Sequence, residues 1–185
     1  MDVINMPKVV PIGEREWFVL FAICVAGKSA KQAEKKLNEY LDGWTGVPFK
    51  AVRCDLEIDG VLLARLKLCR IGQYKRIDRA FREVSKLDVT KDLTVEKLEA
   101  IPGIGPKTAR FIVLYTDPDA QCVPLDTHIL KYLAKHYQGA KVPKSTPAAG
   151  RKYRELELLF QESAKARGKS VRQLDTEVWQ SYAKA

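Results

Sequence analysis

Apolar residues recur every three or four positions along most of the chain, which is the period of a helix with one buried face. In residues 14–27 they spread beyond one face and predict a largely buried helix, whereas in residues 74–87 one apolar stripe lies opposite a face rich in Lys and Arg. The same spacing predicts helices over residues 30–42, 60–72, 94–101, 106–116, 126–137 and 151–168, and a last helix that ends in EVWQSYAKA.

Local signals mark the ends of several of these helices. Ser29 can cap helix 30–42, and Pro106 stands at a first-turn position that tolerates proline. Ser170 and Gln173 form an S-x-x-Q capping box before the last helix. The Gly and Pro content of residues 43–50 predicts a loop. Because no stretch reads convincingly as a strand, the pattern predicts an all-α fold.

Composition and charge narrow the possible partners. The chain has 185 residues, 46% of them hydrophobic, which suits one domain or two small lobes. Its net charge of +9 favours a polyanion such as nucleic acid, although a basic soluble surface explains the charge equally well. No apolar run approaches the ~20 residues of a membrane-spanning helix, and no secretory signal is apparent. We therefore expect no membrane partner, and a cytoplasmic, nucleoid-associated protein or a nuclear one in a eukaryote.

Metal-ligating residues are few and scattered. The cysteines at positions 24, 54, 69 and 122 form no C-x-x-C pair, which argues against a zinc site or an iron–sulfur cluster. With only two histidines, a histidine-rich metal centre is not expected either. We expect no metal site.

The stretch LEAIPGIGPKTA, residues 98–109, predicts a tight turn between two helices. Gly103 and Gly105 permit unusual backbone conformations and close approach, and Ile104 can point inward. The amides of these three residues would then face outward at a helix N-terminus, where they suit a DNA phosphate. A plain turn with a glycine C-cap is the alternative. The longer pattern L-x-x-I-P-G-I-G-x-K-T-A is more specific and resembles the helix-hairpin-helix motif of DNA-binding proteins.

Lys107 and Asp126 carry a further resemblance. The sequence resembles the helix-hairpin-helix DNA glycosylases, the superfamily of endonuclease III and the 8-oxoguanine glycosylases. In that family a lysine follows the G-x-G-x of the hairpin, and a catalytic aspartate lies in a V-D-T-H run, which corresponds to VPLDTH here. Weaker similarity covers most of residues 14–137. The compact archaeal-type 8-oxoguanine glycosylases, which lack cluster cysteines, are the most similar.

The resemblance implies a two-lobed helical glycosylase fold without an iron–sulfur cluster. Residues 28–125 would form a lobe that carries the hairpin, residues 1–27 plus 126–185 would form the other, and a cleft between them would take DNA with a flipped base. The implied function is base-excision repair of double-stranded DNA by a monomeric glycosylase with AP-lyase activity, with 8-oxoguanine as the first candidate base. No cofactor is expected, apart from a monovalent cation that the hairpin can hold in this family.

In this family the two residues divide the chemistry. The carboxylate of Asp126 would stabilise the positive charge that builds on the sugar, and the amine of Lys107 would attack the anomeric carbon to form a Schiff base. Each residue also has a simpler interpretation. Lys107 could only contact a phosphate, and Asp126 could only cap the helix that follows it.

The remaining candidates are contacts to DNA. Gln73 lies in the turn that carries a duplex wedge in the similar enzymes, although it could equally be an exposed turn residue, and Lys28 lies near a second inserted side chain. Trp179 could stack on a flipped base or pack under the final helix, and Asp175 could recognise the base edge. The expected DNA-binding residues are Gly103, Ile104, Gly105, Thr108, Lys28, Gln73, Lys75, Arg76 and His128.

Two other functions stay open at this point. The chain could be a non-catalytic helix-hairpin-helix module that only docks on DNA. It could also be a base-modifying transferase of phage type, which uses the same fold without breaking the glycosidic bond.

Overall fold

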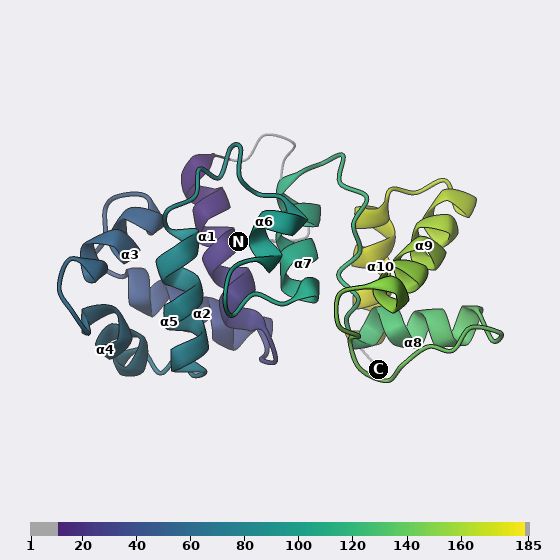
Figure 1. Ribbon diagram of the computed structural model, residues 1–185, viewed down its shortest axis with the longest axis horizontal. Helices are drawn as coiled ribbons and strands as arrows, with labels where there is room; N and C mark the ends of the chain where they lie inside the picture. Colours follow the sequence, from purple (N-terminus) through teal and green to yellow (C-terminus); the bar gives the residue numbers. More distant parts are fainter. Residues whose placement is uncertain (1–10, 184–185) are drawn as a thin grey trace. The chain divides into compact units, whose positions relative to one another are not determined.

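The computed structural model describes residues 11–183, and all regular secondary structure in that range is α-helical (Figure 1). The predicted all-α fold class is therefore confirmed. The helices are α1 (Ile12–Val25), α2 (Ala30–Leu41), α3 (Pro48–Leu56), α4 (Val61–Leu68), α5 (Tyr74–Val84), α6 (Val95–Glu99), α7 (Pro106–Thr116), α8 (Thr127–His136), α9 (Arg151–Ala166) and α10 (Val171–Ala183). None of these helices is long and apolar enough to cross a membrane.

Most helix boundaries differ from the sequence prediction by a few residues, and two of the differences have a clear cause. The prediction of a loop over residues 43–50 is wrong at its end, because α3 begins at Pro48 and buries Phe49 completely. Proline at the first helical position needs no backbone N–H, so it starts this helix rather than preventing it. The helix predicted over residues 60–72 ends at Leu68, because the backbone turns left-handed at Arg70, with a φ of 52°.

The chain divides into two compact units between Ile104 and Gly105. The first unit contains α1 to α6, and the second contains α7 to α10. This division differs from the predicted boundaries at residues 27/28 and 125/126. Helix α1 packs against α2, α3 and α5 of the first unit, while α7 is tied to α9 by an ion pair between Arg110 and Glu157.

The first unit has an apolar core with one buried polar network. The predicted stripe of α5 is confirmed, since Ile77, Ala80, Phe81 and Val84 are all buried. Beside it, Tyr40 Oη donates a hydrogen bond to Asp55 Oδ2 at 2.7 Å, and Arg65 Nη1 donates to Asp55 Oδ1 at 2.7 Å. Both oxygens of this buried carboxylate are therefore satisfied, which offsets much of the cost of burying its charge.

Gly103 and Gly105 differ in their surroundings, which gives a matched pair of substitutions. Gly103 has a φ of +99°, and a Cβ there would lie 2.6 Å from the carbonyl oxygen of Arg76. Gly105 has a φ of −92°, and a Cβ there would meet no atom within 4 Å. We expect Gly103→Ala to lower the free energy of unfolding in urea by on the order of 2–3 kcal/mol. Gly105→Ala should change it by less than about 0.5 kcal/mol. Equal losses in the two variants would contradict this account of the turn.

Candidate active site

Lys107 lies in the first turn of α7, directly after Pro106. Its side chain is half-buried, and Nζ lies 5.4 Å from the centre of the Phe111 ring. The Phe111 ring in turn meets Tyr115 edge-on, with ring centres 5.1 Å apart. Residues four apart share one face of a helix, so α7 presents an amine followed by two aromatic rings along one face. The ring face attracts the amine and holds it against α7.

Asp126 caps α8 with one oxygen of its carboxylate. Oδ1 accepts hydrogen bonds from the backbone amides of His128 at 2.8 Å and Ile129 at 2.9 Å. The predicted N-cap is therefore present. Within residues 11–183, the other oxygen, Oδ2, has no hydrogen-bond donor. The cap consequently fixes the orientation of the carboxylate while leaving one oxygen to meet another charge, so capping and catalysis do not exclude each other.

Asp175 links these two residues electrostatically. It lies on α10 with only 7% of its surface exposed, and Tyr115 Oη donates to its Oδ2 at 2.7 Å. Burial raises the pKa of Asp175 to about 7. The hydrogen bond from Tyr115 lowers this pKa, the charge of Asp126 raises it, and the charge of Lys107 lowers it. The second unit thus brings Lys107, Asp126 and Asp175 into one electrostatic neighbourhood, of the kind that is common at functional sites.

Trp179 follows Asp175 by one turn of α10. Its side chain is 42% exposed, so the structure does not support the alternative in which it packs under the final helix. Because the two residues are four apart, the exposed indole lies on the same side of α10 as the buried carboxyl. An aromatic surface next to a buried hydrogen-bonding group is suited to holding a flat polar ring.

Thr108 and His128, which the sequence predicted as DNA contacts, differ in how far they are buried in the second unit. Thr108 is only 6% exposed, so it packs inside the unit instead of facing solvent. His128 is half-buried, with its ring centre 6.3 Å from that of Tyr182. Among the described residues, no group forms a hydrogen bond with the buried Nδ1 of His128.

Gln73 and Arg76 are tied to each other in the first unit. Gln73 has a φ of +47°, and its Nε2 donates to the carbonyl of Ala26 at 3.1 Å. Arg76 donates from Nε to Gln73 Oε1 at 2.6 Å, from Nη1 to the carbonyl of Gly103 at 2.8 Å, and from Nη2 to the carbonyl of Ile23 at 2.6 Å. Burial lowers the pKa of Arg76. Its guanidinium therefore holds the first unit together, in contrast to the exposed phosphate contact that the sequence predicted, whereas Lys75 is exposed as expected.

Lys28, in the turn between α1 and α2, also bonds the turn that carries Gln73. Its Nζ donates to the carbonyl of Ile71, and burial lowers the pKa of the amine. The turns that carry Lys28 and Gln73 are thus bonded to each other in both directions. The wedge role predicted for Gln73 stays a prediction, but its side chain already has two hydrogen-bonding partners.

The hairpin uses one of the three amides that the sequence expected to face outward. The amide of Ile104 donates to the carbonyl of Ile101 at 3.1 Å, and the Ile104 side chain is 5% exposed. Within residues 11–183, the amides of Gly103 and Gly105 have no hydrogen-bond acceptor. Two amides, rather than three, are therefore left to meet a phosphate.

Sequence analysis missed the residues that surround the candidate catalytic groups. Tyr115 lies eight positions after Lys107, on the same face of α7, and helical spacing alone could have pointed to it. Glu157 interrupts the apolar stripe of α9 and is buried. A charged residue on an otherwise apolar helix face can be recognised from the sequence alone as a candidate for a buried polar contact.

The structure describes no cluster of metal ligands. Within residues 11–183, no group of three or more His, Cys, Asp or Glu side chains could hold a metal ion. The expectation that the chain needs no cofactor, and the expected monovalent cation at the hairpin, stay predictions.

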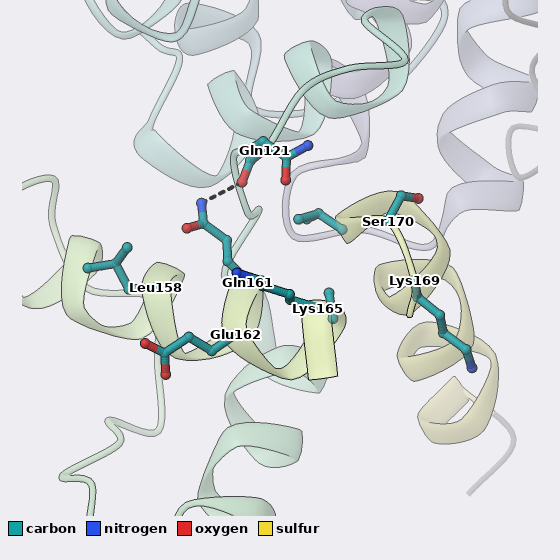
Figure 2. A pocket seen from close by; sticks show the side chains of 9 residues that line it. Gln121, Leu158, Gln161, Glu162, Lys165, Lys169 and Ser170 are labelled. Carbon is teal, nitrogen blue, oxygen red and sulfur yellow. Dashed lines mark hydrogen bonds between the residues drawn. The ribbon is translucent and has the colours of Figure 1, made fainter. Parts of the chain in front are cut away.

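A hollow of about 430 Å³ lies beside the turn between α9 and α10 (Figure 2). Gln121, Gln161 and Lys165 are among the residues that line it, and Lys107, Asp126 and Asp175 are not. In this view Gln161 reaches the carbonyl of Gln121, with Nε2 and the oxygen 2.6 Å apart.

The fold is that of a helical DNA glycosylase. The chain is similar to the crystal structure of an 8-oxoguanine DNA glycosylase from Methanocaldococcus jannaschii, with a TM-score of 0.66 and 21% sequence identity over 92% of this chain and 79% of that chain. No family model matches the sequence. The likeness confirms the predicted helical glycosylase fold, and at this identity it concerns the fold alone.

The raised pKa of Asp175 predicts a pH-dependent stability. The folded chain holds a proton on this carboxyl that the unfolded chain releases above about pH 4. Stability is therefore lost as pH rises from about 4 to about 7 and stays low above that. We expect Asp175→Asn to raise the free energy of unfolding by on the order of 2–4 kcal/mol at pH 8 and by much less at pH 4. Chemical denaturation at both pH values measures the difference.

Asp119→Asn is the control, because Asp119 is an exposed carboxylate of the same unit. It should leave the free energy of unfolding nearly unchanged at both pH values. An equal gain at pH 4 and pH 8 for Asp175→Asn would show that folding does not raise the pKa of Asp175, and would contradict this account.

Proposed function

We propose that this protein is a DNA glycosylase with AP-lyase activity, which removes a damaged base and then cleaves the strand through a Schiff base on Lys107. The observation that supports this most is that Lys107 and Asp126 lie in one compact unit and both shift the pKa of the buried Asp175. They do so on a fold shared with a DNA glycosylase. A capping aspartate or a surface lysine needs no such neighbour.

We propose one step for each of the two groups. After the Lys107 ammonium has lost a proton to water, the lone pair of Nζ attacks the anomeric carbon, the glycosidic bond breaks, and its electron pair leaves with the base, which takes up a proton. Oδ2 of Asp126 faces the positive charge that develops on the sugar, while Oδ1 stays bonded to α8. Loss of the proton next to the resulting Schiff base then releases the 3′ phosphate.

Asp175 and Trp179 form the proposed base pocket. The exposed indole of Trp179 offers a stacking surface for a base that has left the duplex. The carboxyl of Asp175, with a pKa of about 7, is present in both protonation states at neutral pH and can accept or donate a hydrogen bond. We take 8-oxoguanine as the first candidate substrate and oxidised pyrimidines as the second.

DNA binding rests on charge and on the turns. The net charge of +9 favours contact with phosphates. We propose that the free amides of Gly103 and Gly105 each donate to a DNA phosphate, and that Lys75 contributes to phosphate binding from the start of α5. Lys28 and Gln73 would meet the duplex as a bonded pair of turns.

Borohydride trapping tests the chemistry. The protein is incubated with duplex DNA that contains 8-oxoguanine, an oxidised pyrimidine or an abasic site, and the reductant converts any Schiff base to a stable adduct. We expect the wild-type chain to give an adduct, Lys107→Gln to give none, and DNA affinity to stay within about threefold because one lysine contributes little to it. Asp126→Asn should slow base release about 10²–10³-fold.

Lys135→Gln serves as the control, because Lys135 is an exposed lysine of the same unit. It should trap DNA as well as the wild type does. If the wild type gives neither an adduct nor a free base on any of these duplexes, the glycosylase proposal fails. Transfer to a base without bond cleavage, or docking alone, would then explain the fold.

The proposed pocket predicts that base recognition can be separated from strand cleavage. Trp179→Ala removes the stacking surface but leaves Lys107 in place, so it should slow excision of the damaged base by on the order of tenfold or more. Cleavage at a preformed abasic site, where no base needs to be held, should stay within about twofold of wild type. Equal losses in both assays would place Trp179 outside the base pocket.

A further inference from the structure

The segment that leads into Asp126 has no regular secondary structure, and three side chains of α9 form hydrogen bonds with its backbone. Thr146 Oγ1 also donates to Leu125 O at 2.7 Å, and Leu125 N also donates to Val123 O at 3.0 Å. Residues 117–126 connect α7 to α8, and residues 120–126 of this connection follow a turn at 118–119. Three side chains of α9, each one turn from the next, face this segment. The hydrogen bonds are Gln161 Nε2 to Gln121 O at 2.6 Å, Val123 N to Glu157 Oε1 at 2.8 Å, Leu125 N to Tyr153 Oη at 3.0 Å and Tyr153 Oη to Val123 O at 2.8 Å.

The spacing of side chains along α9 matches the spacing of backbone groups along residues 121–125. Four residues of an α-helix advance by about 6 Å. Two residues of an extended chain advance by about 6.6 Å. Side chains at 153, 157 and 161 can therefore meet backbone groups at 125, 123 and 121 in order, with the chains running in opposite directions. Helix α9 thus fixes the register of the segment that delivers Asp126.

Glu157 also reaches the helix that carries Lys107. The same oxygen, Oε1, accepts from Arg110 Nε at 3.0 Å, and Arg110 Nη1 donates to the carbonyl of Pro106 at 3.2 Å. Pro106 directly precedes Lys107. The Arg110 guanidinium also lies over the Tyr153 ring, 4.2 Å from its centre. One carboxylate oxygen therefore joins the first turn of α7 to the segment before Asp126.

Burying the ion pair between Glu157 and Arg110 costs free energy, because both charges lose their hydration. Glu157 is 8% exposed, and replacing such pairs with apolar residues often leaves a fold equally stable. What an apolar pair cannot provide is a fixed register, because apolar contacts have no direction. This argument points to position, more than stability, as the reason for the contact.

We propose that Glu157 and Tyr153 are positioning residues that fix the carboxylate of Asp126 relative to the amine of Lys107. This inference rests on the proposed function, because it assigns the two residues to the same reaction. Neither touches the substrate. They act through the backbone of the segment that ends at Asp126 and, for Glu157, through Arg110.

Tyr153→Phe removes one hydroxyl and keeps the ring, so it tests this inference directly. The matched control is Tyr132→Phe, since Tyr132 is also buried and its hydroxyl bonds Ser163 across the α8–α9 contact instead of the backbone of residues 121–125. The first readout is hydrogen exchange at the amides of His128 and Ile129, which bond Asp126 and not Tyr153. We expect about tenfold faster exchange in Tyr153→Phe and no change in the control.

The second readout is the rate of base excision under single-turnover conditions. We expect Tyr153→Phe to lower this rate about tenfold with DNA affinity unchanged, and to add no loss in an Asp126→Asn background. Tyr132→Phe should keep the wild-type rate. Glu157→Gln, which keeps an acceptor for Val123 but loses the charge that pairs with Arg110, is the second variant and should show the same pattern.

The two readouts separate the possible failures. If the wild type shows no excision and no adduct, the proposed function fails, and hydrogen exchange still decides whether Tyr153 positions Asp126. Unchanged exchange at His128 and Ile129 in Tyr153→Phe, or equal acceleration in Tyr132→Phe, would overturn the inference. So would a further loss of rate in the Asp126→Asn background.

Discussion

The orientation of the Asp126 carboxylate depends on two backbone amides at the start of α8. Those amides hold one oxygen and leave the other to meet charge, so a common helix cap would also prepare Asp126 for the catalytic role that we propose. The cap alone does not set where the carboxylate lies, because the chain before it is extended. Tyr153 and Glu157 of helix α9 fix the position of that chain by hydrogen bonds to Leu125 N and Val123 N. Glu157 also bonds Arg110 on α7, the helix that carries Lys107.

Buried polar groups of the second unit fall into two kinds. Glu157 accepts hydrogen bonds from the amide of Val123 and from the cationic Arg110, which suits a group that holds elements together. Asp175 is buried with a phenol as its nearest hydrogen-bond donor, and its pKa is raised to about 7. A group that lowers stability at neutral pH and yet interacts electrostatically with two candidate catalytic residues fits a functional site better than a structural one.

Much of the fold could be predicted from local patterns. The apolar stripe of α5 and the capping box before α10 depend on residues close in sequence, and both are present as predicted. Helix α3 was missed, because Pro48 reads as a loop residue when glycines precede it. The tight turn at Gly103 could also be predicted, since it depends on a short stretch of chain, and Gly103 has the positive φ that such a turn requires.

The surroundings of the site could not be predicted in the same way. Arg76 looked like one of several basic residues on a solvated face, and only tertiary structure shows that it bonds Ile23 and Gly103. The partners of Glu157 and Asp175 lie 34 to 60 positions away along the chain, beyond any local pattern. Burial, which raises the pKa of Asp175, is likewise a property of the folded unit.

The most direct measurement is to locate the covalent bond between protein and DNA. The wild-type chain is trapped with borohydride on a duplex that contains an abasic site, digested, and sequenced by mass spectrometry. The account predicts that the sugar remnant is attached to Nζ of Lys107. A remnant on another amine, such as Lys28, or the absence of any covalent bond, would contradict it.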